Sequence, residues 1–197
     1  DAYRDSASAI RQRFGLGADR VVGLMVAQDF QRKGLGEAIE ALARCRDRRV
    51  TLLIVGGDNP HRYQDQAKAL GVPDRVIFAG PSGDVPSYDA AADFFVLPTR
   101  HDPCSLVVLE ALAMGLPVIS TQQNGACQVM TTGQHGFVLE RPNDIEGLAN
   151  AMAELADPLK RRPMAQACLE LRPALSQEHH IKQLLSIYEA ILARRRG

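Results

Sequence analysis

Short apolar runs alternate with longer segments of mixed polarity along the first 140 residues of the chain. Within each run the apolar residues are largely consecutive rather than alternating with polar ones. Consecutive apolar residues are typical of strands that are buried on both faces of a parallel sheet. The pattern predicts six such strands, at residues 21–26, 51–55, 75–79, 93–97, 117–120 and 136–139.

The segments between these strands carry apolar residues at helical spacing. In residues 34–46, for example, the apolar stripe includes Leu35, Ile39 and Leu42. Further helices are predicted at residues 59–70, 85–92, 105–114, 145–156 and from 176 onward. Strands that alternate with helices favour an α/β fold, a doubly wound parallel sheet of the Rossmann-like kind. We interpret the chain as one domain with a lead-in segment, a core and C-terminal helices, at residues 1–20, 21–140 and 141–197.

Composition narrows the classes of function. Lys and Arg total 23, as do Asp and Glu, so the net charge is zero and a polybasic nucleic-acid binder is not expected. There is no Trp, and aromatic residues make up 5%, which argues against a stacking platform for single strands. The four cysteines are far apart, which predicts reduced thiols in a cytoplasmic protein rather than a zinc or redox site.

Candidate chemistry should lie at the carboxyl ends of the strands, where such sheets bind ligands. The first strand is followed by Arg32 and Lys33, immediately before a predicted helix. A helix N-terminus already favours anions, so two cations there would strengthen a phosphate site. From this segment alone, two solvated surface cations are an equally good explanation. The turn is neither a Walker loop nor a G-x-G-x-x-G turn, so the sequence gives little support for an ATPase or an NAD-binding function.

The segment after the fourth strand is the most informative. Its helix, residues 105–114, is apolar on every side except at Glu110, which predicts a buried helix with one costly carboxylate. Glu110 would then meet either the hydroxyls of a ligand or a structural Arg. Asp102 stands eight residues earlier in the loop that leads into the helix. Together with the free amides predicted at Ser105, Leu106 and Val107, these carboxylates and the nearby cations suit a polyhydroxylated anion.

Here the sequence resembles a known family. The run D-P-C-S-L-V-V-L-E-A-L-A-M-G-L-P-V-I is similar to the E-x7-E segment of retaining glycosyltransferases of the GT-B fold, family 4. The similarity continues at residues 32–34, 54–57, 91–98 and 133–137, and so covers nearly the whole chain. The similarity is to the C-terminal, donor-binding half of such enzymes and does not include the N-terminal acceptor half. Residues 29–34 look most like the lipopolysaccharide-core glucosyltransferase branch.

The resemblance implies a role for each matching residue. Lys33, with Arg32 beside it, would neutralise the donor diphosphate. Asp102 would hold the transferred sugar, and Glu110 the ribose hydroxyls. Other substrate contacts are implied for the loops at the same edge, at Gln28, Pro81, Ser82, Cys104, Ser105, Leu106 and Val107. Of these, Leu106 and Val107 would act through amides that face the phosphates, while Pro81 and Ser82 lie where the family receives the base.

Three positions depart from the family pattern. Asp102 replaces the usual Glu and is one methylene shorter, Ser105 replaces a frequent Gly, and Gln28 replaces a frequent Arg. No D-x-D pair occurs in the chain, so no metal and no other cofactor is predicted beyond the nucleotide-sugar donor. Protein cations would stabilise the leaving diphosphate instead.

The resemblance implies the nucleotide-sugar-binding domain of a retaining hexosyltransferase, using a UDP-sugar and a glycan or glycolipid acceptor. We expect the domain to be inactive alone, because the acceptor groups lie on the other half. We expect a cytoplasmic protein, and the terminal run at residues 194–196 leaves open peripheral contact of the full-length enzyme with an anionic membrane. Two alternatives stay open: half of a nucleotide-sugar epimerase or hydrolase, and a non-catalytic flavodoxin-like interaction domain.

Overall fold

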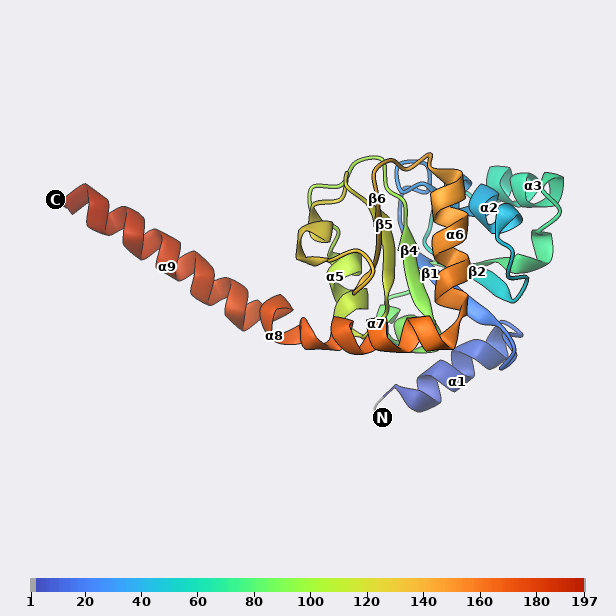
Figure 1. Cartoon of the computed structure of the whole chain (residues 1–197), viewed down its shortest axis with the longest axis horizontal. Coiled ribbons are helices and arrows are strands. Elements are labelled where there is room, and N and C mark those ends of the chain that lie inside the picture. Colours follow the sequence, from blue (N-terminus) through green and yellow to red (C-terminus); the bar gives the residue numbers. More distant parts are fainter. Residues whose placement is uncertain (1–2, 197) are drawn as a thin grey trace.

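A single six-stranded parallel sheet forms the centre of the molecule, with the order β3-β2-β1-β4-β5-β6 (Figure 1). The computed structural model describes residues 3–196, and side chains from residue 3 to residue 192. The strands are β1 (Val21–Val26), β2 (Val50–Val55), β3 (Val76–Gly80), β4 (Phe94–Leu97), β5 (Val118–Thr121) and β6 (Gly136–Leu139). All six predicted strands are confirmed, with ends that differ by no more than one residue.

The middle strands are apolar because both faces of the sheet are covered. Every residue of β2 and all but the last of β1 are buried. Position 23 in β1 is a glycine because a Cβ there would lie 2.6 Å from the ring of Phe94 in the neighbouring strand. The aromatic ring therefore occupies the space that a side chain at position 23 would need.

Helices cover both faces of the sheet in the way that right-handed crossovers require. Helix α2 packs against α3 and α6 on one face, whereas α1, α4 and α5 cover the other. These helices are α1 (Arg4–Arg13), α2 (Leu35–Arg44), α3 (His61–Ala69), α4 (Val85–Ala91), α5 (Leu106–Ala113) and α6 (Ile145–Ala156). The order 3-2-1-4-5-6 is that of a doubly wound Rossmann-like sheet. It differs from the flavodoxin-like order 2-1-3-4-5, so the topology expected under the flavodoxin-like alternative is wrong.

The remaining elements are short turns of 3₁₀-helix and the C-terminal helices. They are η1 (Pro73–Arg75), η2 (Gly125–Val129), α7 (Pro158–Glu170), α8 (Arg172–Leu175) and α9 (Gln177–Arg196). Helix α7 packs against both α5 and α6 and crosses below the sheet, so it joins the two helical layers (Figure 1).

Helices α1 and α7 are held by charge as well as by packing. Arg11 of α1 and Arg161 of α7 both bind Asp93, at 2.7 and 2.9 Å. The same carboxylate accepts the backbone N–H of Val22 at 2.8 Å. The apolar pattern did not predict α1 within the lead-in segment, because none of its side chains is fully buried.

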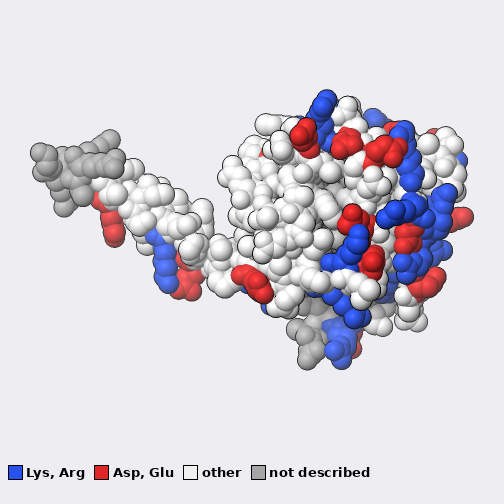
Figure 2. All heavy atoms as spheres, in the orientation of Figure 1, with Lys and Arg blue, Asp and Glu red and all other residues white. Residues whose placement is uncertain are grey.

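Helix α9 projects away from the rest of the domain (Figure 1). Apolar side chains lie exposed along it at helical spacing, at Ile181, Leu184, Leu185, Tyr188, Ile191 and Leu192. The side chains at residues 194–196, considered above for membrane contact, lie outside those described. Figure 2 shows that charged residues gather over the side carrying α2, α3 and α6. Within the described residues, no helix is both long and apolar enough to cross a membrane.

Candidate functional site

A cavity of about 440 Å³ opens at the carboxyl edge of the sheet. Strand β1 lies between β2 and β4, and the connections that leave β1 and β4 cover opposite faces of the sheet. The loops therefore separate there and leave a crevice, which is where such folds bind ligands. Nine of the eleven candidate residues line this cavity: Gln28, Arg32, Lys33, Ser82, Asp102, Cys104, Ser105, Leu106 and Val107.

The loop after β1 reaches the cavity because of one glycine. Gly34 has φ of +80°, and a Cβ there would lie 2.2 Å from the carbonyl oxygen of Pro98. The loop can therefore rest directly on the end of β4. The carbonyl of Arg32 accepts the backbone N–H of Arg100 at 2.9 Å and the hydroxyl of Thr99 at 3.1 Å. These bonds fix the backbone that carries the two candidate cations.

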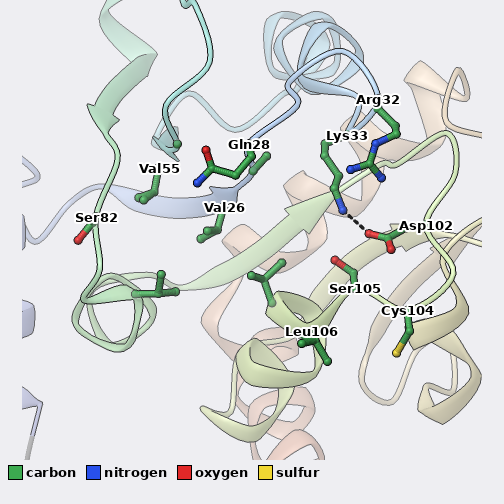
Figure 3. A pocket seen from close by; sticks show the side chains of 14 residues that line it. Val26, Gln28, Arg32, Lys33, Val55, Ser82, Asp102, Cys104, Ser105 and Leu106 are labelled. Carbon is green, nitrogen blue, oxygen red and sulfur yellow. Dashed lines mark hydrogen bonds and ion pairs between the residues drawn. The ribbon is translucent and has the colours of Figure 1, made fainter.

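Lys33 and Asp102 form an ion pair inside the cavity, in which Lys33 Nζ donates to Asp102 Oδ2 (Figure 3). Their side chains are 11% and 10% exposed, so the pair is largely shielded from water. Burial acts to raise the pKa of Asp102, but the hydrogen bond and the charge of Lys33 outweigh it, and the pKa is lowered. The Ser105 hydroxyl and the Cys104 backbone amide also lower it. Asp102 is therefore ionised at neutral pH.

Arg32 lines the same cavity but is more exposed than Lys33. Its Nε donates to Asp29 at 3.2 Å, and its Nη1 donates to the carbonyl of His101 at 3.0 Å. The guanidinium thus joins the loop after β1 to the loop after β4. It contributes charge to the cavity while it also fixes the distance between the two loops.

Two unpaired backbone donors lie at the start of α5. The N–H groups of Leu106 and Val107 have no hydrogen-bond partner among residues 3–196. Ser105 is different, because its N–H donates to Asn124 Oδ1 at 3.3 Å. The prediction of three free amides is therefore wrong by one. The two that remain, with Lys33 nearby, can bind an oxyanion.

Asn124 was not singled out from the sequence, although it organises the site. Its side chain is buried, and besides Ser105 it accepts the N–H of Ala126 at 3.1 Å and donates to Ser120 Oγ at 3.1 Å. Its backbone bridges to Asp102. An Asn-Gly pair predicts only a turn. The contacts that matter reach residues far away along the chain, which a local pattern does not reveal.

The buried setting predicted for Glu110 is wrong. Helix α5 buries only Val108, Ala111 and Leu112, whereas Leu106 is 66% exposed and Glu110 is also exposed. Apolar composition on every side did not imply burial, because one side of α5 has no neighbour among the described residues. Glu110 lies one turn beyond Leu106, beside the cavity rather than in its lining. Pro81 is also absent from that lining, although the next residue, Ser82, belongs to it.

The carboxylate whose burial costs free energy is instead Asp89, on α4. It is 2% exposed, and its Oδ1 accepts no hydrogen bond within the described part of the chain. Burial, and then the negative charge of Glu110, raise the pKa of Asp89 to about 7. The buried carboxylate that must be paired or neutralised is therefore Asp89 on α4, and not Glu110 on α5.

A metal centre finds no support in the side chains that the structure describes. Among them, no group of three or more His, Cys, Asp or Glu could hold a metal ion. That the reaction proceeds without a metal or other cofactor stays a prediction from the sequence.

Comparison with known proteins gives one family and several relatives. Residues 6–168 match the family described as glycosyl transferases group 1. The lipopolysaccharide glucosyltransferase WaaG of Escherichia coli K12 is 32% identical over 179 residues, which are 89% of this chain and 46% of that protein. A GDP-mannose-dependent phosphatidylinositol monomannoside mannosyltransferase of Mycolicibacterium smegmatis is 33% identical over 177 residues, 83% of this chain and 46% of that protein.

Solved structures agree with these relatives. Anabaena HepE, in complex with UDP and glucose, superposes with a TM-score of 0.82 at 26% identity, covering 95% of this chain and 52% of that one. The chain thus spans about half the length of the proteins it matches.

Proposed function

This chain belongs to the glycosyl transferases group 1 family, and on that premise we propose that its cavity binds the nucleotide-sugar donor of a retaining glycosyltransferase. One observation carries the proposal: a shielded lysine and two unpaired helix amides, at Lys33, Leu106 and Val107, border the same crevice. This arrangement suits a diphosphate, the group that every nucleoside-diphosphate sugar contains.

The arrangement also suits the chemistry of transfer. When the bond between sugar and phosphate breaks, negative charge collects on the departing diphosphate. A fixed cation and fixed amides stabilise that charge more than they stabilise the intact donor, and this difference accelerates the reaction. Lys33 and the start of α5 are the groups in position to do so. Asp102, on the opposite side of the ion pair, would accept hydrogen bonds from hydroxyls of the transferred sugar.

The nucleoside would extend from the diphosphate toward β3. Ser82, in the loop after β3, lines that part of the cavity, so we place the base there, near Pro81. Glu110 lies one turn along α5 from the phosphate-facing amides. Its carboxylate is exposed and makes no hydrogen bond or ion pair within the described part of the chain, so it is free to accept the ribose hydroxyls.

A uracil base is favoured by the complex of Anabaena HepE with UDP, whereas the mycobacterial relative is GDP-mannose-dependent. The preference is tested by thermal shift and calorimetry with UDP, GDP and ADP, each alone and as a sugar conjugate. Saturable binding with UDP strongest is the expected result. If none of the three nucleotides binds, the proposed function is wrong.

We further propose that the acceptor is a glycan or glycolipid, bound by a region of the protein outside this chain. The lipopolysaccharide glucosyltransferase of E. coli supports this acceptor class. Product analysis with the full-length protein distinguishes a transferase from the epimerase or hydrolase alternative. A transferase yields free UDP and a glycosylated acceptor, and the anomeric configuration of the sugar is retained. Release of UDP at the same rate with and without any acceptor would instead favour the alternative.

A further inference from the structure

The ion pair in the cavity must rearrange when a diphosphate binds. We propose that Asp102 makes the site prefer an intact nucleotide-sugar donor over the nucleoside diphosphate that remains after transfer. This inference rests on the proposed function, and it assigns Asp102 a role in discriminating donor from product that is separate from the chemistry of transfer.

Lys33 and Asp102 balance each other's charge inside the cavity. Lys33 and Asp102 both line the cavity, and each is about nine-tenths shielded from water. In this structure the charge of Lys33 is therefore neutralised by Asp102. A diphosphate can bind Lys33 at full strength only by drawing Nζ away from Asp102 Oδ2, and it also meets the negative charge of Asp102 at close range. Asp102 thus competes with the diphosphate for its main cation.

Asp102 loses its charged hydrogen-bond donor when Lys33 turns toward a phosphate. Besides Lys33, the Ser105 hydroxyl and the Cys104 backbone amide interact with its carboxylate and lower its pKa. These two donors stay in place when Lys33 turns toward a phosphate. One oxygen, Oδ2, is then left without its charged donor in a poorly hydrated place, which costs free energy.

The attached sugar distinguishes the donor from the product. The hydroxyls of a sugar attached to the diphosphate can donate to Asp102 Oδ2 and so replace the lost bond with Lys33. A nucleoside diphosphate without sugar offers no such donor, and the penalty stays. Once the sugar has been transferred, Lys33 regains Asp102 as the diphosphate departs. The pair therefore weakens product binding selectively, which limits inhibition by the product.

The test is calorimetric titration of UDP and UDP-glucose into the full-length protein. Asp102→Asn keeps the size and one acceptor oxygen but removes the charge. It should tighten UDP binding on the order of tenfold while UDP-glucose gains little, so the preference for the donor falls. Asp102→Glu keeps the charge and should keep the preference within about threefold. Uridine, which has no phosphate, should bind the wild type and Asp102→Asn equally.

Each outcome is decisive. An unchanged ratio of the UDP and UDP-glucose dissociation constants in Asp102→Asn overturns the inference, although the proposed function survives. Failure of the wild-type protein to bind either nucleotide refutes the proposed function and this inference together. If circular dichroism shows that Asp102→Asn does not fold, Asp102→Ser, which keeps a hydroxyl acceptor, carries the same expectation.

Discussion

Asp89 allows a test of how a buried carboxyl group affects the stability of the fold. Its carboxyl group has a pKa of about 7 in the folded protein, against an ordinary value of 3.8, because burial and then the charge of Glu110 disfavour ionisation. The difference of about three units corresponds to about 4 kcal/mol, at 1.36 kcal/mol for each unit. Asp89→Asn removes the ionisable group and keeps the size of the side chain.

The sign follows from proton binding. Below pH 3.8 both the folded and the unfolded states hold the proton, so the group has no effect on stability. As the pH rises from 3.8 to about 7, the unfolded chain loses this proton while the folded protein keeps it. The free energy of unfolding therefore falls over this range and stays lower above it. Asp89→Asn should match the wild type near pH 4 and exceed its stability at pH 7.5, by up to about 4 kcal/mol.

Urea denaturation at pH 4, 5.5 and 7.5 measures this difference. Asp65→Asn is the matched control, since Asp65 lies exposed in an i,i+3 pair with Lys68 and should change stability little at any pH. An advantage of Asp89→Asn that does not grow between pH 4 and pH 7.5 would refute the reasoning about Asp89.

Three further predictions concern the site. Lys33→Ala should lower the turnover of the full-length enzyme by roughly 10²-fold in a steady-state assay, because a fixed charge stabiliser is lost; wild-type turnover would contradict its role. Glu110→Gln should weaken UDP binding in calorimetry without lowering the melting temperature, since Glu110 is exposed; unchanged affinity with a large loss of stability would make it structural. Asn124→Ala should lower kcat about tenfold with little effect on UDP affinity, because the loop that carries Asp102, proposed to bind the sugar, loses its support. Ser120→Ala removes only one of the three side-chain bonds of Asn124 and should lower kcat less; equal losses in both variants would argue against positioning.

The fold could be predicted well from the sequence because its strands are buried on both sides. A run such as residues 50–55 carries one strong signal, continuous apolarity, and the structure buries every residue in it. The edge of the sheet at which the cavity opens followed from the topology alone. Lys33 and Asp102 could therefore be placed together, although 69 residues separate them.

The rest depended on information that local patterns do not contain. Glu110 was misjudged because the sequence does not show which side of a helix lacks a neighbour. Asp89 was overlooked because one acidic residue in a short helix gives no sign of being buried. Asn124 acts through hydrogen bonds to distant segments, and the first helix is held through Asp93. In each case the missing information is which distant segments meet in space.

The central claim is that a diphosphate binds between Lys33 and the first turn of α5. A crystal structure of the protein with a UDP-sugar tests it most directly. We expect the diphosphate within hydrogen-bond distance of Lys33 Nζ and of the N–H groups of Leu106 and Val107, with Asp102 facing the sugar. A nucleotide bound elsewhere on the molecule, with the Lys33–Asp102 pair intact and the crevice unoccupied, would contradict the account.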